Sequence, residues 1–485
     1  MSTRVIPKWM GFSLFILVAA AFLLPFIGAW QGYLSTPNRG SLAWDPALHF
    51  ISGVRLYKQL TTGDIPSFVY EILSMGYWLP VHPLLVTMTN LFAPYAVEPA
   101  VFLNYLILCL STTGAIWIIA AHSPRETRMP QGAAAFLVMA CLLRVLAPSN
   151  TWVATLNNIM LEMTGFGLTL VFCVAAYQAL STEKPSYYRV AAVALLGLFL
   201  TKFHYGIWVA FPFLLVRSVS LVKKLSNDRS EITPFLQATL RRPYVRVLAV
   251  AAAAVLGLLL YRILTGNHQV QWGPVRLSMG RMGTFIWFFL FCPLLIWTVE
   301  WVKKRNLLLR KLSPEARILH HYCLFPYAWY FLFPFRHKVG VIIQNAAQGQ
   351  AKLSYLDQAS YYPRVLLHEY LSGALPTVAI ALTLLPLVAL ILLAALKRHL
   401  RRPVAFLLGA LLFYYLTMSF LNQNKEPRMA ITWVAEFVAC ALIAAHELAT
   451  PVLKKLAGRL AAKRIAIGVA VCLAGMILVW PHRFT

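Results

Sequence analysis

Two side chains that can do acid–base chemistry lie one helical turn apart near the start of the chain. Residues 43–49 read AWDPALH, so Asp45 and His49 share one face of a helix. Asp45 can act as a general base that removes a proton from an acceptor hydroxyl within hydrogen-bond reach, while His49 can orient an acceptor or a phosphate. The alternatives are that Asp45 only caps a helix with Pro46 at its first position, and that His49 is a solvated histidine.

Basic side chains later in the chain can hold an anion. Lys202 and His204 interrupt an apolar region, where such side chains are costly unless they face a polar cavity. Lys425, Glu426 and Arg428 lie in a short polar segment between two apolar stretches. The two cations of this segment can hold a lipid phosphate, although a tight loop with internally paired charges has the same composition.

Further candidates stand beside prolines, beside aromatic residues or within apolar stretches. His82 lies between two prolines that fix an extended turn before a helix. Arg364 follows two tyrosines, a combination that suits a sugar phosphate and equally suits a bilayer interface. Glu162, Glu436 and Arg144 are the charges nearest to the membrane interior, either as functional groups or as structural ion pairs.

The composition predicts an all-α, polytopic integral membrane protein. The 485 residues are 60% hydrophobic and 12% charged, whereas a soluble domain has about 25% charged residues. Apolar stretches of about 20 residues recur, which is long enough to cross a hydrocarbon core of about 30 Å. We expect one transmembrane domain over residues 1–485 with about 13 spans. These are 9–31, 99–121, 131–147, 160–180, 190–201, 204–217, 247–264, 283–301, 319–335, 374–396, 404–421, 429–448 and 465–481.

The net charge of +27 does not indicate nucleic-acid binding, because the cations stand in short segments between apolar stretches. Lys and Arg are concentrated in segments that lie inside if the N-terminus is cytoplasmic, in keeping with the positive-inside rule. The outer side then holds residues 32–98, 336–370 and 422–428. We expect a bacterial inner (plasma) membrane with the active site facing outside, and an endoplasmic reticulum membrane is the alternative.

The first outer loop, residues 32–98, is too long for a simple connection. A helix is expected to start at Asp45, with an apolar stripe at helical spacing. A second helix is expected over residues 83–91. With their apolar faces on the membrane, both helices are predicted to be interfacial.

The order of these motifs resembles the polytopic C-type (GT-C) glycosyltransferases, among them the protein O-mannosyltransferases and the lipid A aminoarabinose transferase. Their first outer loop typically has Asp-Glu followed by an aromatic residue, then a helix and Pro-Pro-x-x-Pro-Leu. Asp45 matches the first acid, Pro46 replaces the second and His49 takes the aromatic position. Residues 79–84, LPVHPL, resemble the later motif, and residues 424–429, NKEPRM, resemble His-Lys-Glu-x-Arg-Phe.

Residues 201–203, TKF, also resemble the Thr-Lys-Tyr that ends a short span in these enzymes. The resemblance implies inverting transfer of a sugar from a polyprenyl or dolichyl phosphate to a hydroxyl of a glycan, lipid or protein, with Asp45 as general base. It implies no certain cofactor, and it leaves divalent-metal use open because Pro46 replaces the second acid. The predicted substrate-binding residues are His49, His82, Lys202, His204, Arg364, Lys425, Glu426 and Arg428.

Two other classes of protein fit part of the pattern. An O-antigen polymerase or ligase also handles lipid-linked glycans and is expected to use a large late outer loop rich in Arg and His. The late loop of this chain carries Arg336, His337, Lys338, Arg364 and His368. A secondary transporter, the second alternative, fits the two short spans within 190–217, since transporters often contain broken helices.

Overall fold

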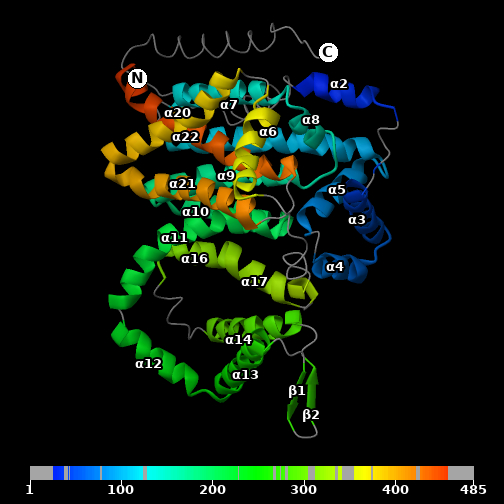
Figure 1. Ribbon diagram of the computed structural model, residues 1–485, viewed down its shortest axis with the longest axis vertical. Coiled ribbons are helices and arrows are strands. Elements are labelled where there is room, and N and C mark those ends of the chain that lie inside the picture. The colour runs from blue at the N-terminus through cyan, green and yellow to red at the C-terminus, as the bar shows by residue number, and fades with distance from the viewer. Residues whose placement is uncertain are drawn as a thin grey trace, which may run out of the picture. The chain divides into compact units, whose positions relative to one another are not determined.

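The computed structural model describes residues 26–37, 42, 44–76, 79–123, 128–227, 229–265, 269–272, 275–278, 282–303, 312–333, 337–340, 354–372, 375–421 and 426–456. These parts are almost entirely helical (Figure 1), which confirms the helical prediction apart from one antiparallel pair of short strands. The elements up to residue 240 are α2 (Ile27–Ser35), α3 (Trp44–Thr61), α4 (Ile65–Ser74), α5 (Val81–Phe92), α6 (Val97–His122), α7 (Arg128–Leu146), α8 (Asn150–Leu156), α9 (Glu162–Thr182), α10 (Pro185–Thr201), α11 (Phe203–Asn227) and α12 (Arg229–Leu240). The later elements are α13 (Pro243–Thr265), β1 (Gln269–Trp272), β2 (Val275–Ser278), α14 (Met282–Val302), α16 (Pro314–Leu319), η2 (His320–Leu324), α17 (Phe325–Leu332), α19 (Tyr355–Arg364), η3 (Val365–Tyr370), α20 (Pro376–Leu396), η4 (Arg398–Leu400), α21 (Arg401–Leu416), η5 (Thr417–Leu421), η6 (Pro427–Ala430) and α22 (Ile431–Leu456).

The described helices identify a membrane-embedded protein. Seven of them are long and apolar enough to cross a membrane, or up to 8 if α7 and α8, which are bent by 102°, form one span. The larger number of spans expected from the sequence is not confirmed. Of the expected spans, 465–481 lies wholly outside the described residues and 9–31 lies largely outside them. The seven are Glu98–His122, Glu162–Thr182, Pro243–Arg262, Gly283–Val302, Pro376–Leu396, Arg398–Phe420 and Pro427–Val452.

Two expected features take a different form. The break predicted between 190–201 and 204–217 is present, because Lys202 is extended (φ −156°, ψ 118°) between α10 and α11. However, α11 is 25 residues long and not a half-length helix, since polar helix formers continue it beyond the apolar run. In place of the expected span 319–335, three short elements follow one another as α16, the π-helical η2 and α17.

The chain divides into two compact units, which are described separately. Unit 1 comprises Met1–Thr61, Val81–Phe213 and Ala351–Thr485. Unit 2 comprises Thr62–Pro80 and Leu214–Gln350. The organisation as one transmembrane domain stays a prediction.

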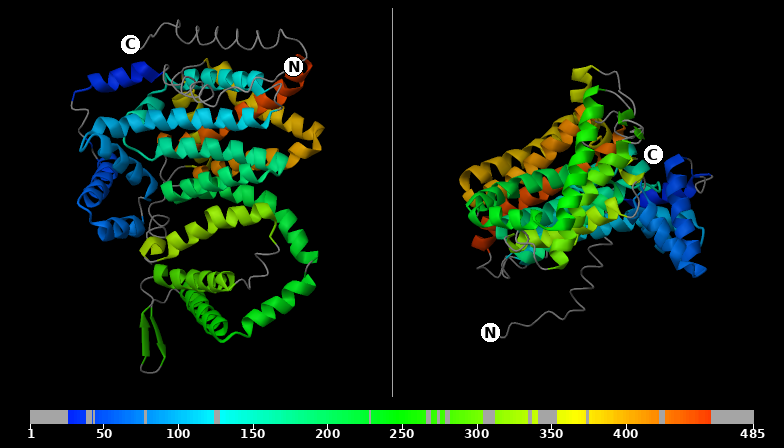
Figure 2. Two further views of the ribbon diagram at one scale, coloured as in Figure 1. Left: turned by 180° about the vertical axis from the view of Figure 1, so that it is seen from behind. Right: turned by 90° about the horizontal axis from the view of Figure 1, so that it is seen from below.

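In unit 1, α9 packs against α6, α10, α21 and α22, and these helices lie side by side (Figures 1 and 2). The span in α9 is 89% buried, as expected for a helix that is apolar all round. Glycine permits its closest contact. A Cβ atom at Gly165 would lie 2.5 Å from the ring of Tyr205, so α9 lies directly against the start of α11.

Helices α3, α4 and α5 lie within residues 32–98, the predicted first outer loop, so both helices expected there are present. Because α3 starts at Trp44, Asp45 lies within its first turn and not at the cap. α3 packs on α5 where Gly53 approaches Val86, and the Thr87 hydroxyl donates a hydrogen bond of 3.1 Å to the Gly53 carbonyl. This contact fixes the first part of α3. The interfacial position of these helices stays a prediction.

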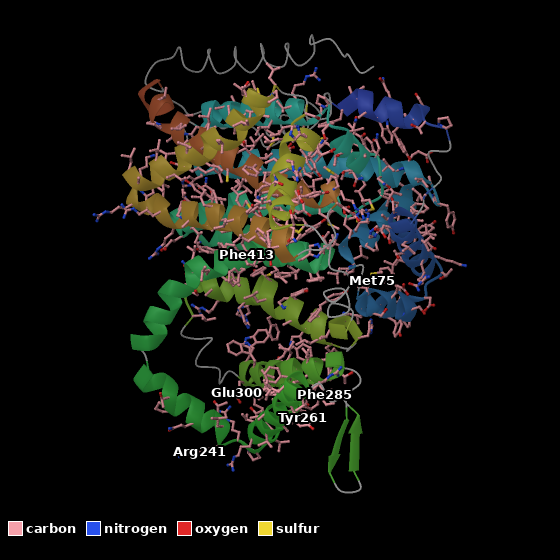
Figure 3. The ribbon with its side chains drawn as sticks, in the orientation of Figure 1. Met75, Arg241, Tyr261, Phe285, Glu300 and Phe413 are labelled. Carbon is pink, nitrogen blue, oxygen red and sulfur yellow. The ribbon has the colours of Figure 1, made fainter. Side chains whose placement is uncertain are left out.

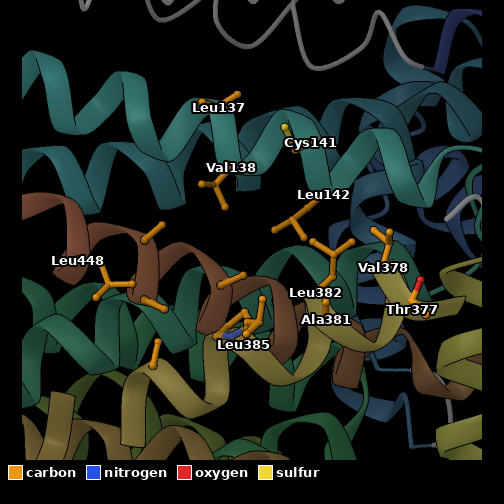
Figure 4. A pocket seen from close by; sticks show the side chains of 15 residues that line it. Leu137, Val138, Cys141, Leu142, Thr377, Val378, Ala381, Leu382, Leu385 and Leu448 are labelled. Atoms are coloured by element: carbon orange, nitrogen blue, oxygen red, sulfur yellow. The ribbon is translucent and has the colours of Figure 1, made fainter. Parts of the chain in front are cut away.

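An apolar groove of about 570 Å³ also lies in unit 1, between α7, α20 and α22 (Figure 4). Its walls are almost wholly aliphatic and contain none of the predicted site residues. The residues that line it are Leu137, Val138, Cys141, Leu142, Thr377, Val378, Ala381, Leu382, Leu385, Pro386, Ala389, Ala441, Ala444, Ala445 and Leu448.

In unit 2, α13 and α14 lie side by side. A buried carboxylate near the end of α14 pairs with residues at the start of α13. Glu300, labelled in Figure 3, is 2% exposed. It pairs with the guanidinium of Arg242 and accepts a hydrogen bond from the hydroxyl of Tyr244. A buried carboxylate needs such partners, because an unpaired buried charge is strongly destabilising.

Replacing Gly165 by alanine should destabilise the protein. The new Cβ atom would collide with the ring of Tyr205, and overpacking of this kind costs about 1–3 kcal/mol. Thermal unfolding in detergent measures the effect. Gly257→Ala is the control, because no atom lies within 4 Å of the corresponding Cβ position. Equal melting temperatures for the two variants would contradict the close contact between α9 and Tyr205.

Candidate functional site

Asp45 forms an ion pair with Arg428, although the two residues are 383 positions apart. The distance between the Asp45 carboxylate and the Arg428 guanidinium is 3.2 Å, and Nε of Arg428 donates to the Glu426 carboxylate. All three side chains are about one-third exposed. The pair joins α3, in the first outer loop, to η6, which leads directly into α22. These two segments therefore lie at the same end of the helices of unit 1.

Two tyrosine hydroxyls hold the turn that carries Arg428. Tyr370 donates a hydrogen bond of 3.1 Å to the carbonyl of Pro427, and Tyr414 donates to the carbonyl of Met429. Carbonyls on both sides of Arg428 are thereby satisfied, and the turn cannot rotate without losing both bonds. The backbone itself thus directs the guanidinium of Arg428 toward Asp45.

Lys202 lies at the break between α10 and α11. Its ammonium is 5.3 Å from the centre of the Tyr205 ring and 3.5 Å from Sδ of Met429, the residue after Arg428. Burial lowers the pKa of Lys202, while nearby carboxylates, that of Glu162 foremost, act in the opposite direction. Lys202 therefore shares one electrostatic environment with the ion pair.

His49 and His82 face each other with their ring centres 5.2 Å apart, and both are fully buried. Burial, followed by the charges of His82, Lys202 and Arg428, lowers the pKa of His49 to about 2. Burial lowers the pKa of His82 to about 4. Both imidazoles are therefore neutral at pH 7. The interpretation of His49 as a solvated histidine is wrong, because the packing of α3 on α5 covers it.

The sequence identifies Glu162 as one of three charges near the membrane interior, either a functional group or a member of a structural ion pair. Glu162 begins α9, is 1% exposed and is the foremost carboxylate acting on both Lys202 and Arg428. Among the described residues, no cation lies within 4.0 Å of its carboxylate, and Oε2 accepts no hydrogen bond. A simple structural ion pair therefore does not account for Glu162.

The other predicted residues lie next to this cluster, apart from it or outside the described residues. His204 follows Lys202 by two positions, and its ring centre lies 4.6 Å from that of Trp208. Arg364 is 58% exposed and has its described partners, Asp357 and Ser360, on its own helix. Lys425 lies outside the described residues. We name the remaining set, Asp45, Glu162, Lys202, Glu426 and Arg428, the charged cluster.

Comparison of the chain with family models, curated proteins and solved structures finds no match. The functional argument therefore rests on the fold and the charged cluster of this chain. In the described parts, no three His, Cys, Asp or Glu side chains gather closely enough to hold a metal ion. What the charged cluster offers is a carboxylate base, two cations for an anion and a buried carboxylate beside them.

Lowering the pH below 6.5 should destabilise the protein through His49 and His82. Their folded-state pKa values lie below the ordinary value of about 6.5, so the unfolded chain takes up protons that the folded chain does not. The free energy of unfolding then falls by about 2 kcal/mol per histidine between pH 7 and pH 5.

Thermal unfolding in detergent at several pH values measures this loss. A variant with His49→Asn and His82→Asn should show a flatter pH profile than the wild type. His399→Gln, at an exposed position, should leave the profile unchanged. The same slope in all three proteins would refute the assignment to the buried pair.

Proposed function

We propose that the chain is a membrane glycosyltransferase that moves a sugar from a polyprenyl or dolichyl phosphate carrier to an acceptor hydroxyl, with inversion at the anomeric carbon. The observation that carries the proposal is the convergence of Asp45, Lys202 and Arg428 from three distant parts of the chain. These residues were selected from the sequence as a base and as phosphate-binding cations. Their proximity supports one site that holds both chemical roles.

The position of the cluster suits a donor that is anchored in a bilayer. Glu162 begins one apolar span, Arg428 lies at the start of another, and Lys202 follows the end of α10. Helix ends of this kind lie at the boundary between hydrocarbon and water, where a lipid phosphate also lies. The membrane is a bacterial inner membrane with the site facing outward and the N-terminus inside.

The ion pair between Asp45 and Arg428 gives the donor phosphate a specific place to bind. A guanidinium binds phosphate through two parallel hydrogen bonds, as it binds a carboxylate. Because Asp45 and Arg428 are only partly buried, their contact is weak enough to be exchanged. A phosphate that engages Arg428 and Lys202 releases Asp45, which is then free to accept a proton.

The transfer uses the side chains as follows. The O–H bond of the acceptor breaks as its proton passes to Asp45, and the oxygen bonds to the anomeric carbon on the face opposite the phosphate. The bond between that carbon and the phosphate oxygen breaks, and its electron pair leaves with the lipid phosphate. Arg428 and Lys202 stabilise the negative charge that develops on the leaving phosphate.

His49 and His82 support this reaction without touching substrate. Their rings face each other in the contact between α3 and α5, and their neutral state adds no charge beside the cations. They pack α3 against α5 and so hold Asp45 in place. In this proposal they are positioning residues.

Of the described late-loop residues that favoured an O-antigen polymerase or ligase, Lys338 is engaged in packing, whereas His337, Arg364 and His368 are exposed. Lys338 is fully buried and donates a hydrogen bond of 2.6 Å to the carbonyl of Tyr330. His337 contacts the carbonyl of Ser74 at 2.8 Å.

Asp45→Asn should abolish most of the activity. Loss of a general base lowers the rate by about 10²- to 10⁴-fold, and asparagine preserves the shape of the side chain. Transfer of labelled sugar from a panel of synthetic polyprenyl-phosphate sugars to a membrane extract measures the rate. Asp64→Asn is the matched control, because asparagine also caps the helix α4 that Asp64 caps. A full rate for Asp45→Asn would overturn the proposed function.

Arg428→Lys should reduce kcat/KM by about 10²- to 10³-fold, the loss expected for one donor to a developing oxyanion. Lysine keeps the charge but cannot form two parallel hydrogen bonds with the phosphate. The same transfer assay measures the loss, and Arg189→Gln at an exposed position of α10 serves as control. An unchanged kcat/KM in Arg428→Lys would place the donor phosphate elsewhere.

A further inference from the structure

Glu162 is a buried carboxylate that the reaction described above does not use. It is 1% exposed, and no donor within the described residues reaches its Oε2 atom. A buried carboxylate oxygen without a hydrogen-bond donor is destabilising. A ligand beside Oε2 can supply the missing donor.

The chain holds Glu162 in place through the turn between α8 and α9. The side-chain amide of Asn104 donates to the carbonyls of Leu156 and Asn158, at 3.1 and 2.5 Å. The side-chain amide of Asn157 donates to the carbonyl of Ala29 at 3.2 Å. The bonds from Asn104 satisfy carbonyls of the turn and the bond from Asn157 ties the turn to α2, so the first residues of α9 are positioned independently of any ion pair with Glu162.

The surroundings of Glu162 define the chemistry of its ligand. Nη1 of Arg428 lies 3.7 Å from Sδ of Met160, two residues before Glu162, and the ring of Tyr205 lies against Gly165, three residues after Glu162. The ammonium of Lys202 is 5.3 Å from the centre of the same Tyr205 ring. In the described parts of the chain, the Tyr205 hydroxyl has no hydrogen-bond partner either. The ligand must therefore present an anion to the two cations and, close to that anion, a hydroxyl that donates to a carboxylate.

A glycosyl phosphate has this arrangement, because the hydroxyl on C2 stands on the carbon next to the one that carries the phosphate. We propose that Glu162 accepts a hydrogen bond from the C2 hydroxyl of the donor sugar while Lys202 and Arg428 hold the phosphate. The proposal rests on the proposed glycosyl transfer and adds a rule of substrate selection. The enzyme prefers donors with a free C2 hydroxyl over donors that lack it.

The test compares matched pairs of synthetic polyprenyl-phosphate sugars, each with its 2-deoxy counterpart, as donors for the wild type and for Glu162→Gln and Glu162→Ala. The wild type should prefer the hydroxylated donor by about 10- to 100-fold in kcat/KM, because a hydrogen bond to a charged group is lost. Both variants should reduce this preference to less than about threefold, because the loss of Glu162 and the loss of the hydroxyl remove the same contact.

Glu436→Gln is the control, since Glu436 is also 1% exposed and neither of its carboxylate oxygens has a described hydrogen-bond partner. It should keep the wild-type preference. Melting temperatures show that each variant folds. The wild type alone already tests the preference for donors with a free C2 hydroxyl. Two outcomes would overturn this inference and leave the proposed function intact. In the first, the 2-deoxy donor lowers kcat/KM by the same factor in the wild type and in the Glu162 variants. In the second, it does not lower kcat/KM in the wild type. No transfer from any donor overturns the proposed function and this inference with it.

Discussion

The packing that brings Asp45 and Arg428 into contact is the constraint on which the arrangement of the site depends. An ion pair that is one-third exposed contributes at most about 1 kcal/mol, so it cannot by itself bring together segments 383 residues apart. The packing of α3 on α5 and the two tyrosine hydrogen bonds to the carbonyls on either side of Arg428 hold these segments in place. The ion pair is therefore a consequence of packing. Because packing and not the ion pair holds the two segments, a ligand can replace Asp45 as the partner of Arg428 without disrupting the fold.

The charges of the cluster are unbalanced in an informative way. Asp45, Glu162 and Glu426 bring three negative charges, and Lys202 and Arg428 bring two positive ones. A phosphate enters such a place only if further positive potential is present. The sequence has one further cation, Lys425, directly before Glu426, and its role as a phosphate contact stays a prediction.

The sequence predicted the members of the site better than their environments. Asp45 was selected as a base at a helix start, Lys202 because charge in an apolar region is costly, and Glu426 and Arg428 because they lie in a short polar segment between apolar stretches. Each of these arguments concerns single residues. None of them can predict which charges meet, because this depends on how helices pack. Glu162 could therefore be selected only together with Glu436 and Arg144, as one of three charges near the membrane interior.

The burial of His49 and the isolation of Arg364 have the same cause. The apolar stripe of α3 indicated a membrane surface, yet part of it packs on α5 through Gly53, and no local pattern distinguishes the two. The tyrosines before Arg364 suggested a binding site, but the guanidinium turns to Ser360 and Asp357 on its own helix. Helix periodicity was predictable, since it is a property of the chain, whereas contacts between helices were not.

Helix direction supplies the remaining part of the electrostatic argument. Asp45 lies in the first turn of α3, Glu162 begins α9, and Arg428 lies in η6, directly before α22. The N-terminal end of a helix carries about half a positive charge, so three helix starts at one site offset more than one carboxylate. The spans in α9 and α22 are 89% and 83% buried, whereas that in α20 is 17% buried. In the protein interior these dipoles are weakly screened, and they act on any anion at the site. The backbone dipoles thus make the site electropositive, while its side chains carry charges of both signs. This combination suits a ligand that joins a phosphate to hydroxyl groups.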